Sequence, residues 1–444
     1  MPPLRPLFTL FLLFWVLTGC APKTAPLPAL TESVTPFLSQ VPAPLKDEEK
    51  KRLYADFLSR HYAPWQMREL NVTRAQAAWA VGHYAKKRLY GENRLPLDPK
   101  RFEAWVENAD YEAFNRLGRH AVTVYPTSLR LFPTMRPIFY DPSLPGEGYP
   151  FDYNQNSAVK AMTPLIVSHL SRDGGWAFVQ TPFALGWVPI RDIAWIDEAQ
   201  IERIMRLPKT VVIKERLPVY DRKQSFLFYA KLATLFPVTG AEPAFRKILI
   251  PRRSADGTLR LEASLLPEAW GGAMPLPMTR ENLFEVAKEL LGEPYGWGGM
   301  VGDRDCSAMT RDFFAPFGIW LPRNSRAQAK VGRVISLKGM SDSQKEKRIV
   351  EEGVPFRTLL YLPGHIMLYV GHSNGRAYVM HNLWGIRTEG GGRHIVGRAV
   401  VTDLHLGENL PEADKEALLI KRVVSMNIVT GVFDGNREAE IGNR

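Results

Sequence analysis

Only two cysteines occur in this chain of 444 residues, and their positions limit how the fold can be held together. Cys20 closes an N-terminal segment in which Leu7 to Leu17 is an almost unbroken apolar run. This run, preceded by Arg5, is too short to span a bilayer as a mature helix and indicates a secretory signal. An exported protein that keeps one thiol, Cys306, cannot form an internal disulfide. The second cysteine therefore needs another explanation.

The ending of this segment, Leu17-Thr18-Gly19-Cys20, resembles the bacterial lipoprotein box, in which the cysteine is lipidated and becomes the new N-terminus. The alternative is an ordinary signal peptide with an incidental cysteine. No second apolar segment of spanning length follows, so we expect a protein anchored by lipid on Cys20 and otherwise soluble. The net charge of +11 suits an anionic surface. The basic residues are scattered, without the blocks or aromatic platforms that indicate a nucleic-acid partner.

The texture of the chain changes several times after this segment. A stretch rich in Pro, Ala, Thr and Leu indicates a tether, and a stretch with helical apolar spacing follows it. Two stretches of short β-rich runs, broken by Pro, Gly and Asp, then predict two successive small barrels. The predicted ranges are 1–20 for the signal peptide, 21–45 for the tether, 46–119 for a helical N-terminal domain, 120–198 and 199–275 for the barrels, and 276–444 for the last domain.

Cys306 falls at the start of a predicted helix, a few residues after a glycine-rich loop. A cysteine acts as a nucleophile in its thiolate form, which the partial positive charge at a helix N-terminus favours. The alternative is a small buried hydrophobe, which is what most cysteines outside disulfides are. A nucleophile also needs a base, and the best candidate is His365, which opens a predicted strand after Gly364.

The two strands on either side of a polar turn form a predicted hairpin, whose register decides which polar residue lies beside His365. With a two-residue turn at Asn374-Gly375, His365 shares a face with Asn382. With a loop of three or five residues, His365 lies diagonal to His381 on the same face. We favour the five-residue loop, His372 to Arg376, because of its polar content. His381 would then hold the imidazole of His365 in the required tautomer.

Together these pieces resemble the NlpC-type bacterial cell-wall cysteine peptidases, which have a papain-like core. The resemblance is carried by Tyr295 to Gly299, Asp305 to Ser307, Leu321 to Gln328, Pro363 to His365 and His381. Upstream, Phe151 to Ser157 and Asp173 to Trp176 resemble the first of two SH3-like barrels in one branch of this family, and His61 to Trp65 resembles its N-terminal helical segment. The implied fold class is α+β multidomain: a helical N-terminal segment, two small SH3-like β-barrels and a papain-like α+β peptidase domain.

The resemblance implies roles for particular residues. Cys306 would be the nucleophile, with its backbone N–H in the oxyanion hole, His365 the general base and His381 the orienting group. The residues implied to line the substrate site are Tyr295, Trp297, Asp305, Ser307 and Ser325. Asp305 is expected to hold a substrate ammonium, to cap the helix, or both.

One motif departs from the family pattern. The chain reads Arg323-Asn324-Ser325, where relatives are expected to carry an acidic residue before the serine. This departure weakens the expectation of a strict demand for a free amino terminus. In the first barrel, Asp152 and Tyr153 are the candidates to reach the cleft.

The implied activity is hydrolysis of the γ-D-glutamyl bond to meso-diaminopimelate in peptidoglycan stem peptides, through a thioester acyl-enzyme, with preference for a free N-terminal L-Ala. The alternatives are an endopeptidase on intact peptidoglycan, a catalytically inactive wall-binding lipoprotein, and acyl transfer by the same residues. No cofactor and no metal are implied, because the nine histidines and two cysteines show no ligand spacing.

The expected partners are stem peptides and, through lipid on Cys20, the membrane. The expected state is a monomer at the periplasmic face of the cell envelope. In a Gram-negative cell the outer membrane is favoured, because Ala21 rather than Asp follows the lipidated cysteine.

Overall fold

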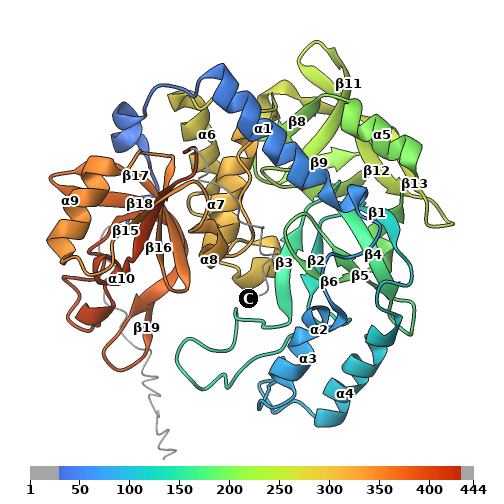
Figure 1. Cartoon of the computed structure of the whole chain (residues 1–444), viewed down its shortest axis with the longest axis horizontal. Helices are drawn as coiled ribbons and strands as arrows, with labels where there is room; N and C mark the ends of the chain where they lie inside the picture. The colour runs from blue at the N-terminus through green and yellow to red at the C-terminus, as the bar shows by residue number, and fades with distance from the viewer. Residues whose placement is uncertain (1–29, 432–444) are drawn as a thin grey trace, which may run out of the picture.

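The computed structural model describes residues 30–431 and shows a helical segment, two β-modules and a C-terminal α+β module in chain order (Figure 1). The predicted signal peptide, with Cys20, lies outside these residues. Within them, no helix combines the length and the apolar character needed to cross a membrane.

The expectation of a tether over 21–45 is wrong for the part that the structure describes. Residues 30–45 lie on the C-terminal module and include a 3-10 helix, η1 (Thr35–Gln40). Val34 and Phe37 are buried in the main hydrophobic core. Burial of such a side chain stabilises a fold by about 1.5–3 kcal/mol. These two apolar residues therefore fix a stretch whose Pro and Ala content resembles that of a spacer.

The helical segment that follows is built around one long helix. Its elements are α1 (Asp47–Tyr62), η2 (Ala63–Gln66), α2 (Arg74–Ala77), α3 (Trp79–Tyr84), α4 (Pro99–Asn108) and η3 (Tyr111–Ala113). Leu53 and Phe57 of α1 join the core of the C-terminal module, whereas Tyr62 and Trp65 join the core of the second barrel. The segment therefore connects modules that are far apart in the sequence.

The first β-module is a seven-stranded sheet with the order β3-β2-β6-β5-β4-β1-β7, antiparallel throughout. Its strands are β1 (Arg119–Thr123), β2 (Thr127–Arg130), β3 (Gln155–Val159), β4 (Pro164–Leu170), β5 (Trp176–Gln180), β6 (Leu185–Pro189) and β7 (Ile193–Trp195). The 3-10 turn η4 (Ile190–Asp192) connects β6 to β7. A long connection between β2 and β3, residues 131–154, reaches toward the C-terminal module.

The second β-module begins with α5 (Glu198–Arg206), whose first turn is closed by a capping box between Asp197 and Gln200. A five-stranded sheet has the order β13-β12-β11-β8-β14, and a two-stranded hairpin pairs β9 with β10. The elements are β8 (Lys209–Val212), β9 (Leu217–Tyr220), β10 (Phe226–Ala230), β11 (Leu235–Glu242), β12 (Phe245–Arg253), β13 (Leu259–Pro267), η5 (Glu268–Trp270) and β14 (Gly271–Ala273). The prediction of two successive small β-barrel modules is confirmed.

The C-terminal module places helices against a six-stranded sheet of order β15-β20-β16-β17-β18-β19. Its strands are β15 (Arg333–Ser336), β16 (Thr358–Leu362), β17 (His365–Ser373), β18 (Arg376–Arg387), β19 (Arg393–Asp403) and β20 (Ser425–Ile428). Its helices are α6 (Arg280–Leu290), η6 (Trp297–Gly302), α7 (Cys306–Phe314), η7 (Ala315–Phe317), α8 (Ser325–Gln328), α9 (Asp342–Glu352), η8 (Lys415–Ala417) and α10 (Leu419–Arg422). The late strand β20 lies between β15 and β16, so the tail completes the sheet.

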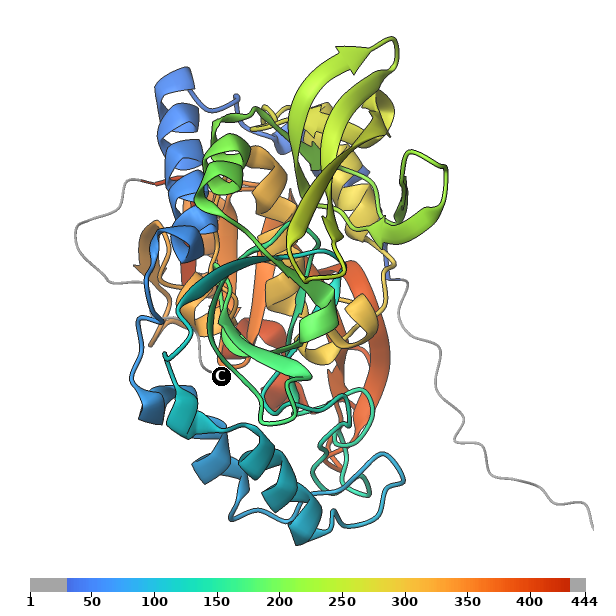
Figure 2. The same cartoon turned by 90° about the vertical axis from the view of Figure 1, so that its right-hand side faces the viewer.

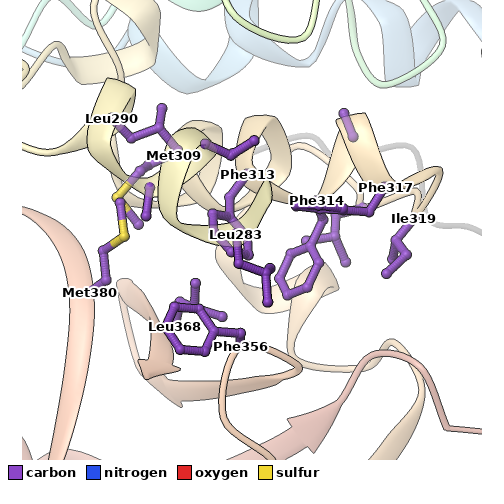
Figure 3. Close-up of a cluster of buried hydrophobic side chains, with 14 of the residues drawn as sticks. Leu283, Leu290, Met309, Phe313, Phe314, Phe317, Ile319, Phe356, Leu368 and Met380 are labelled. Carbon is purple, nitrogen blue, oxygen red and sulfur yellow. The ribbon is translucent and has the colours of Figure 1, made fainter. Parts of the chain in front are cut away.

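The predicted inner faces of α6 and α7 form the core of this module. Met309 and Phe313 of α7 pack in one buried cluster with Leu283 of α6 and the sheet residues Leu368 and Met380 (Figure 3). Figure 2, turned by 90°, shows the first β-module in front of this helix layer, and β3 contacts the glycine-rich turn η6. The first barrel is thus placed beside the start of α7.

Candidate active site

Helix α7 begins at Cys306 because Asp305 caps it. The Asp305 carboxylate accepts a hydrogen bond from the backbone N–H of Ala308 at 2.9 Å, which satisfies one donor at the helix start. Cys306 is 8% exposed, at the positive end of the helix dipole. The predicted helix-cap role of Asp305 is confirmed.

The helix that begins at Cys306 lies beside the strands that carry both predicted histidines. Helix α7 packs against β17 and β18 (Figure 1). Cys306 belongs to the same buried cluster as Ile366, next to His365, and Met380, next to His381. Asp305, next to Cys306 in the chain, lies close enough to His365 to act on its pKa, so the start of α7 and the strands of the two histidines meet although they are up to 75 positions apart in the chain.

The two histidines form a hydrogen-bonded pair. Nε2 of His365 lies 2.9 Å from Nδ1 of His381, and Nε2 of His381 lies 3.1 Å from the hydroxyl of Thr402. Burial, helped by Arg422, lowers the pKa of His365 to about 4, although Asp305 opposes the shift. Burial and the neighbouring His365 lower the pKa of His381 far below its ordinary value. Both rings are therefore neutral at pH 7.

The hairpin register that pairs these histidines arises differently from the prediction. The five-residue loop is wrong, because β17 extends to Ser373 and a two-residue turn follows at Asn374-Gly375, with φ of 50° and 76°. This turn pairs Ser373 with Arg376, but the register shifts between Tyr369 and Gly371. The bulge moves the strand by one residue. His365 therefore lies beside His381, as predicted.

The bulge is held by a residue from η1. The Gln40 side chain accepts a hydrogen bond from the backbone N–H of His372 at 3.0 Å and donates one to its carbonyl at 2.7 Å. At Gly371, φ is 144°, and a Cβ atom would lie 2.8 Å from the Gln40 side-chain oxygen. Glycine is therefore required where this amide approaches the strand.

Asn382, the alternative partner of His365, has another role. Its amide donates hydrogen bonds to the carbonyls of Arg304 at 2.9 Å and Pro294 at 3.3 Å. Since adjacent strand residues point to opposite faces, Asn382 fastens the loop before α7 while His381 contacts His365.

Asp305 is engaged by a buried cation. Arg323, whose side chain is 2% exposed, donates to both carboxylate oxygens of Asp305, at 2.8 Å and 3.1 Å. Ser307 donates to the same carboxylate at 3.0 Å and accepts from Arg323 at 2.8 Å. Burial lowers the pKa of Arg323, but Asp305 outweighs burial and the net effect raises it. The geometry does not support Asp305 as the holder of a substrate ammonium, because its oxygens are occupied.

Sequence reasoning missed the importance of Arg323. The motif was judged by its Asn324, which caps α8 by accepting from the N–H of Ala327 at 2.8 Å. The signal that the sequence offered was an arginine directly after the apolar pair Leu321 and Pro322. Ser325, the first residue of α8, is half-buried.

The glycine-rich loop fits against the first barrel only because it lacks side chains. Gly298 and Gly299 have φ of 63° and 85°, and a Cβ at either position would collide with the backbone of Gln155 or Ala158 in β3. The N–H of Gly298 donates to Asp305 at 3.2 Å, and its carbonyl accepts from Gln155 at 3.3 Å. The barrel therefore fixes the loop that precedes the nucleophile.

An aromatic cluster extends from this loop. The ring of Phe151, from the β2–β3 connection, lies 5.3 Å from Trp297, 6.2 Å from Tyr295 and 5.4 Å from Trp384 of β18. Tyr295 and Trp297 are half-buried. Phe151 and Trp384 were not predicted to be site residues, because nothing in the local sequence distinguishes them from core aromatics.

The first barrel also contributes a tyrosine and a carboxylate. The Tyr153 ring lies 5.7 Å from Trp297, and its hydroxyl donates to Glu147 at 3.0 Å. Asp152, the other barrel candidate, is instead buried and forms an ion pair with Arg130 at 2.7 Å. Of the two candidates, Tyr153 therefore reaches the aromatic loop and Asp152 supports the barrel.

Comparisons with known proteins agree with this architecture. Models of four domains match: the N-terminal stabilising domain of NLPC_P60 proteins (9–114), an SH3 domain of SH3b1 type (137–189), an SH3 domain of SH3b2 type (197–243) and the NlpC/P60 family (292–386). A solved NlpC/P60 endopeptidase from Photobacterium damselae subsp. piscicida has a TM-score of 0.83 at 23% identity, over 92% of this chain and 99% of that chain. This likeness shows that the fold is shared across all modules.

Curated relatives resemble the catalytic region. A probable endopeptidase of Corynebacterium glutamicum is 30% identical over 88 residues, 20% of this chain and 42% of that protein. A γ-D-glutamyl-L-lysine dipeptidyl-peptidase of Bacillus subtilis is 33% identical over 94 residues, 21% of this chain and 30% of that protein. The chain thus spans less than half the length of these relatives. These findings identify a protein with an NlpC/P60 family domain preceded by two SH3b domains and an N-terminal stabilising domain.

Proposed function

We propose that this protein is a cysteine endopeptidase that hydrolyses the γ-D-glutamyl bond to the diamino acid of peptidoglycan stem peptides. The observation that carries the proposal is the neutral, hydrogen-bonded pair of His365 and His381 on strands that pack against the helix beginning at Cys306. The Bacillus subtilis relative is named for a γ-D-glutamyl bond to lysine, a diamino acid, which supports the choice of bond.

The proposed reaction begins with proton transfer from the Cys306 thiol to neutral His365. The sulfur attacks the carbonyl carbon, and the positive end of α7 stabilises the negative oxygen that forms. His365 returns the proton to the departing amine as the C–N bond breaks, leaving a thioester. Water then attacks the thioester with His365 as base, and the C–S bond breaks as the sulfur regains its proton.

Arg323 supports the nucleophile indirectly. A buried Asp305 without a cation would disfavour a neighbouring thiolate by like-charge repulsion. The two-point ion pair between Arg323 and Asp305 cancels that charge while Asp305 still caps α7. The start of the helix thus keeps a carboxylate without a net negative field at the sulfur.

In this proposal Glu147 binds the free N-terminal amine, a role that was expected for Asp305. Its carboxylate accepts a hydrogen bond from Tyr153, whose ring lies beside Trp297 of the active-site loop. An ammonium bound here would gain a charge-assisted hydrogen bond. The first barrel, which carries Glu147, lies at one end of the aromatic loop. A carboxylate at that end would select short peptides with a free amine, such as those released from the wall.

The deciding experiment uses protein that starts after residue 20. It is incubated with L-Ala-γ-D-Glu-meso-diaminopimelate, with a free or an acetylated amine, and with intact peptidoglycan; products are read by mass spectrometry. Release of L-Ala-D-Glu from the free-amine peptide alone, lost in Cys306→Ala and weakened about tenfold or more in Glu147→Gln, is the expected result.

Other outcomes separate the alternatives. Equal cleavage of both peptides, or cleavage of intact wall, would remove the amine requirement and favour an endopeptidase on peptidoglycan. Transfer of the acyl group to an added amine would indicate acyl transfer. Wall binding without any cleavage would leave a catalytically inactive binding protein.

The same proposal includes location. The protein is anchored by lipid on Cys20 at the periplasmic face of the envelope, in the outer membrane if the cell is Gram-negative, and acts as a monomer. Incorporation of a labelled fatty acid into the whole protein but not into Cys20→Ala tests the anchor. Label in both proteins, or in neither, would contradict it, and light scattering of the protein that starts after residue 20 tests the monomer.

A further inference from the structure

The histidine pair is connected to a third polar group on β19. Thr402 lies diagonal to His381 across the β18–β19 ladder, since His381 pairs with Val400. Its hydroxyl lies 3.1 Å from Nε2 of His381, and it donates to the backbone carbonyl of Asp403 at 2.9 Å. His381 is 0% exposed and Thr402 5%, so bulk water does not compete for these bonds.

We propose that Thr402 sets the tautomers of both histidines and so leaves Nδ1 of His365 unprotonated for the thiol. This inference rests on the proposed function, in which His365 takes the proton of Cys306. Thr402 would be a positioning residue, since it acts through His381 and does not touch the substrate.

The direction of the bonds follows from counting protons. A hydroxyl has one proton, and that of Thr402 is donated to the Asp403 carbonyl, so Thr402 offers His381 only a lone pair. Nε2 of His381 must then carry a proton, and its Nδ1 must be the acceptor. The 2.9 Å bond between the rings is therefore donated by Nε2 of His365. A neutral imidazole carries one proton, so Nδ1 of His365 has none.

The opposite direction would disable the base. If Thr402 donated to Nε2 of His381, the proton of each ring would move to Nδ1, and His365 would meet the thiol with an N–H group. The fixed backbone at Asp403 opposes this reversal. Its carboxylate accepts from Arg376 at 2.9 Å and from the N–H of His405 at 2.9 Å, which holds the carbonyl in reach of Thr402.

The first test reads the tautomers directly, without any substrate. Long-range proton–nitrogen NMR of ¹⁵N-histidine-labelled protein that starts after residue 20 distinguishes the two neutral tautomers, with His365→Gln and His381→Gln as assignment variants. We expect Nε2–H on both rings of the wild-type protein. Nδ1–H on either ring would overturn the proposal.

The second test measures the reactivity of the Cys306 thiol. Alkylation of Cys306 by iodoacetamide at pH 7 is expected to slow about tenfold to a hundredfold in Thr402→Val, which keeps the β-branched shape but removes the lone pair. Thr402→Ser, which keeps the hydroxyl, is expected to restore the rate. The matched control is Thr210→Val in the second barrel, whose buried hydroxyl donates to the Gly272 carbonyl at 2.9 Å. It should lose similar stability to urea with no change in alkylation.

These readouts separate the two proposals. An unchanged alkylation rate and unchanged tautomers in Thr402→Val would refute the role of Thr402 even if the wild-type enzyme cleaves stem peptides. Conversely, the predicted tautomers and a Thr402-dependent thiol, found together with no cleavage of any wall peptide, would keep this inference and overturn the proposed function. A Thr402→Val protein that fails to fold is replaced by Thr402→Ala, with the wild-type NMR result still decisive.

Discussion

The two sides of the candidate site accommodate their buried polar groups in opposite ways. On the helix side, a buried charge is cancelled by another, Arg323 against Asp305. On the hairpin side, His365, His381 and Thr402 are neutral and hold one another by hydrogen bonds with a fixed direction. We call these the charged half and the neutral half.

The difference shows what each half contributes. A buried ion pair adds little net stability, but loss of one partner leaves an uncompensated charge and is expensive. A neutral chain of hydrogen bonds costs less to disturb, but its proton positions decide whether a base works. We therefore expect damage to the charged half to appear first as unfolding and damage to the neutral half first as lost activity.

The largest expected effect breaks the charged half. Arg323→Met leaves the Asp305 carboxylate buried without its guanidinium, which should lower the free energy of unfolding by about 3–5 kcal/mol, measured by urea denaturation. Arg323→Lys should recover only part of this loss, because an ammonium cannot make the same two-point contact. Adding Asp305→Asn to Arg323→Met should also recover part of it, since the unpaired charge is removed.

An exposed arginine provides the comparison. Arg206 forms an ion pair with Glu202 on the surface of α5. Arg206→Met should cost less than about 1 kcal/mol. If Arg323→Met costs no more than this control, the charged half does not determine folding and the comparison fails.

Acid should act first on the neutral half. Burial lowers the pKa of His381 in the folded protein well below 6.5. At pH values between this lowered pKa and the pKa of the unfolded chain, the unfolded chain therefore binds more protons than the folded protein. Unfolding stability is therefore fully present above about pH 6.5 and is lost as pH falls, by about 2 kcal/mol between pH 6.5 and 5 for a fully buried histidine. His365, with a pKa lowered to about 4, changes stability in the same direction.

The measurement compares how much unfolding stability each protein loses between pH 7 and pH 5. Urea denaturation at pH 7 and pH 5 should show a smaller pH-dependent loss for His381→Asn than for the wild type, whatever the absolute stability of the variant. Equal losses in both proteins would show that His381 does not bring a neutral ring into the fold. Arg323 of the charged half should not contribute in this range, because Asp305 outweighs burial and raises the pKa of its guanidinium above the usual value.

Local sequence signals predicted the framework of the site. The cap at Asp305 and the apolar faces of the flanking helices depend on neighbours a few residues away, so they can be read from the chain. The His365–His381 pairing was also predicted, but from a loop that does not exist. The actual register combines an Asn374-Gly375 turn with a bulge beside Gly371. A bulge adds one residue without a strong sequence signal, so two deviations cancelled.

Long-range contacts could not be read in this way. The partner of Arg323 is 18 positions away, and Gln40 contacts a residue 332 positions away. The approach of Phe151 to Trp297 depends on how the first barrel is placed. Each of these contacts is a product of tertiary packing, and the residues involved have ordinary neighbours in the sequence.

The smallest expected effect concerns the bulge in the hairpin that carries the histidines of the neutral half. Gln40→Ala removes the two hydrogen bonds that hold the backbone of His372 at the bulge, which should lower unfolding stability by about 1 kcal/mol. The hairpin without this clamp can adopt the register of its two-residue turn, in which Asn382 takes the place of His381. We therefore expect a fall in turnover of about threefold to tenfold, larger than a loss of about 1 kcal/mol in global stability explains.

A second glutamine separates register from stability. Gln200 donates to the Leu259 carbonyl at 2.9 Å in the second barrel, so Gln200→Ala removes a comparable side-chain amide far from the hairpin. It should cost similar stability, with turnover and the hydrogen exchange of the His372 amide unchanged. Faster exchange at His372 and lower turnover in Gln40→Ala alone would show that the N-terminal segment sets the register of the histidines. Equal behaviour of the two variants would show that the bulge persists without Gln40 and that the neutral half is fixed by β18 and β19 alone.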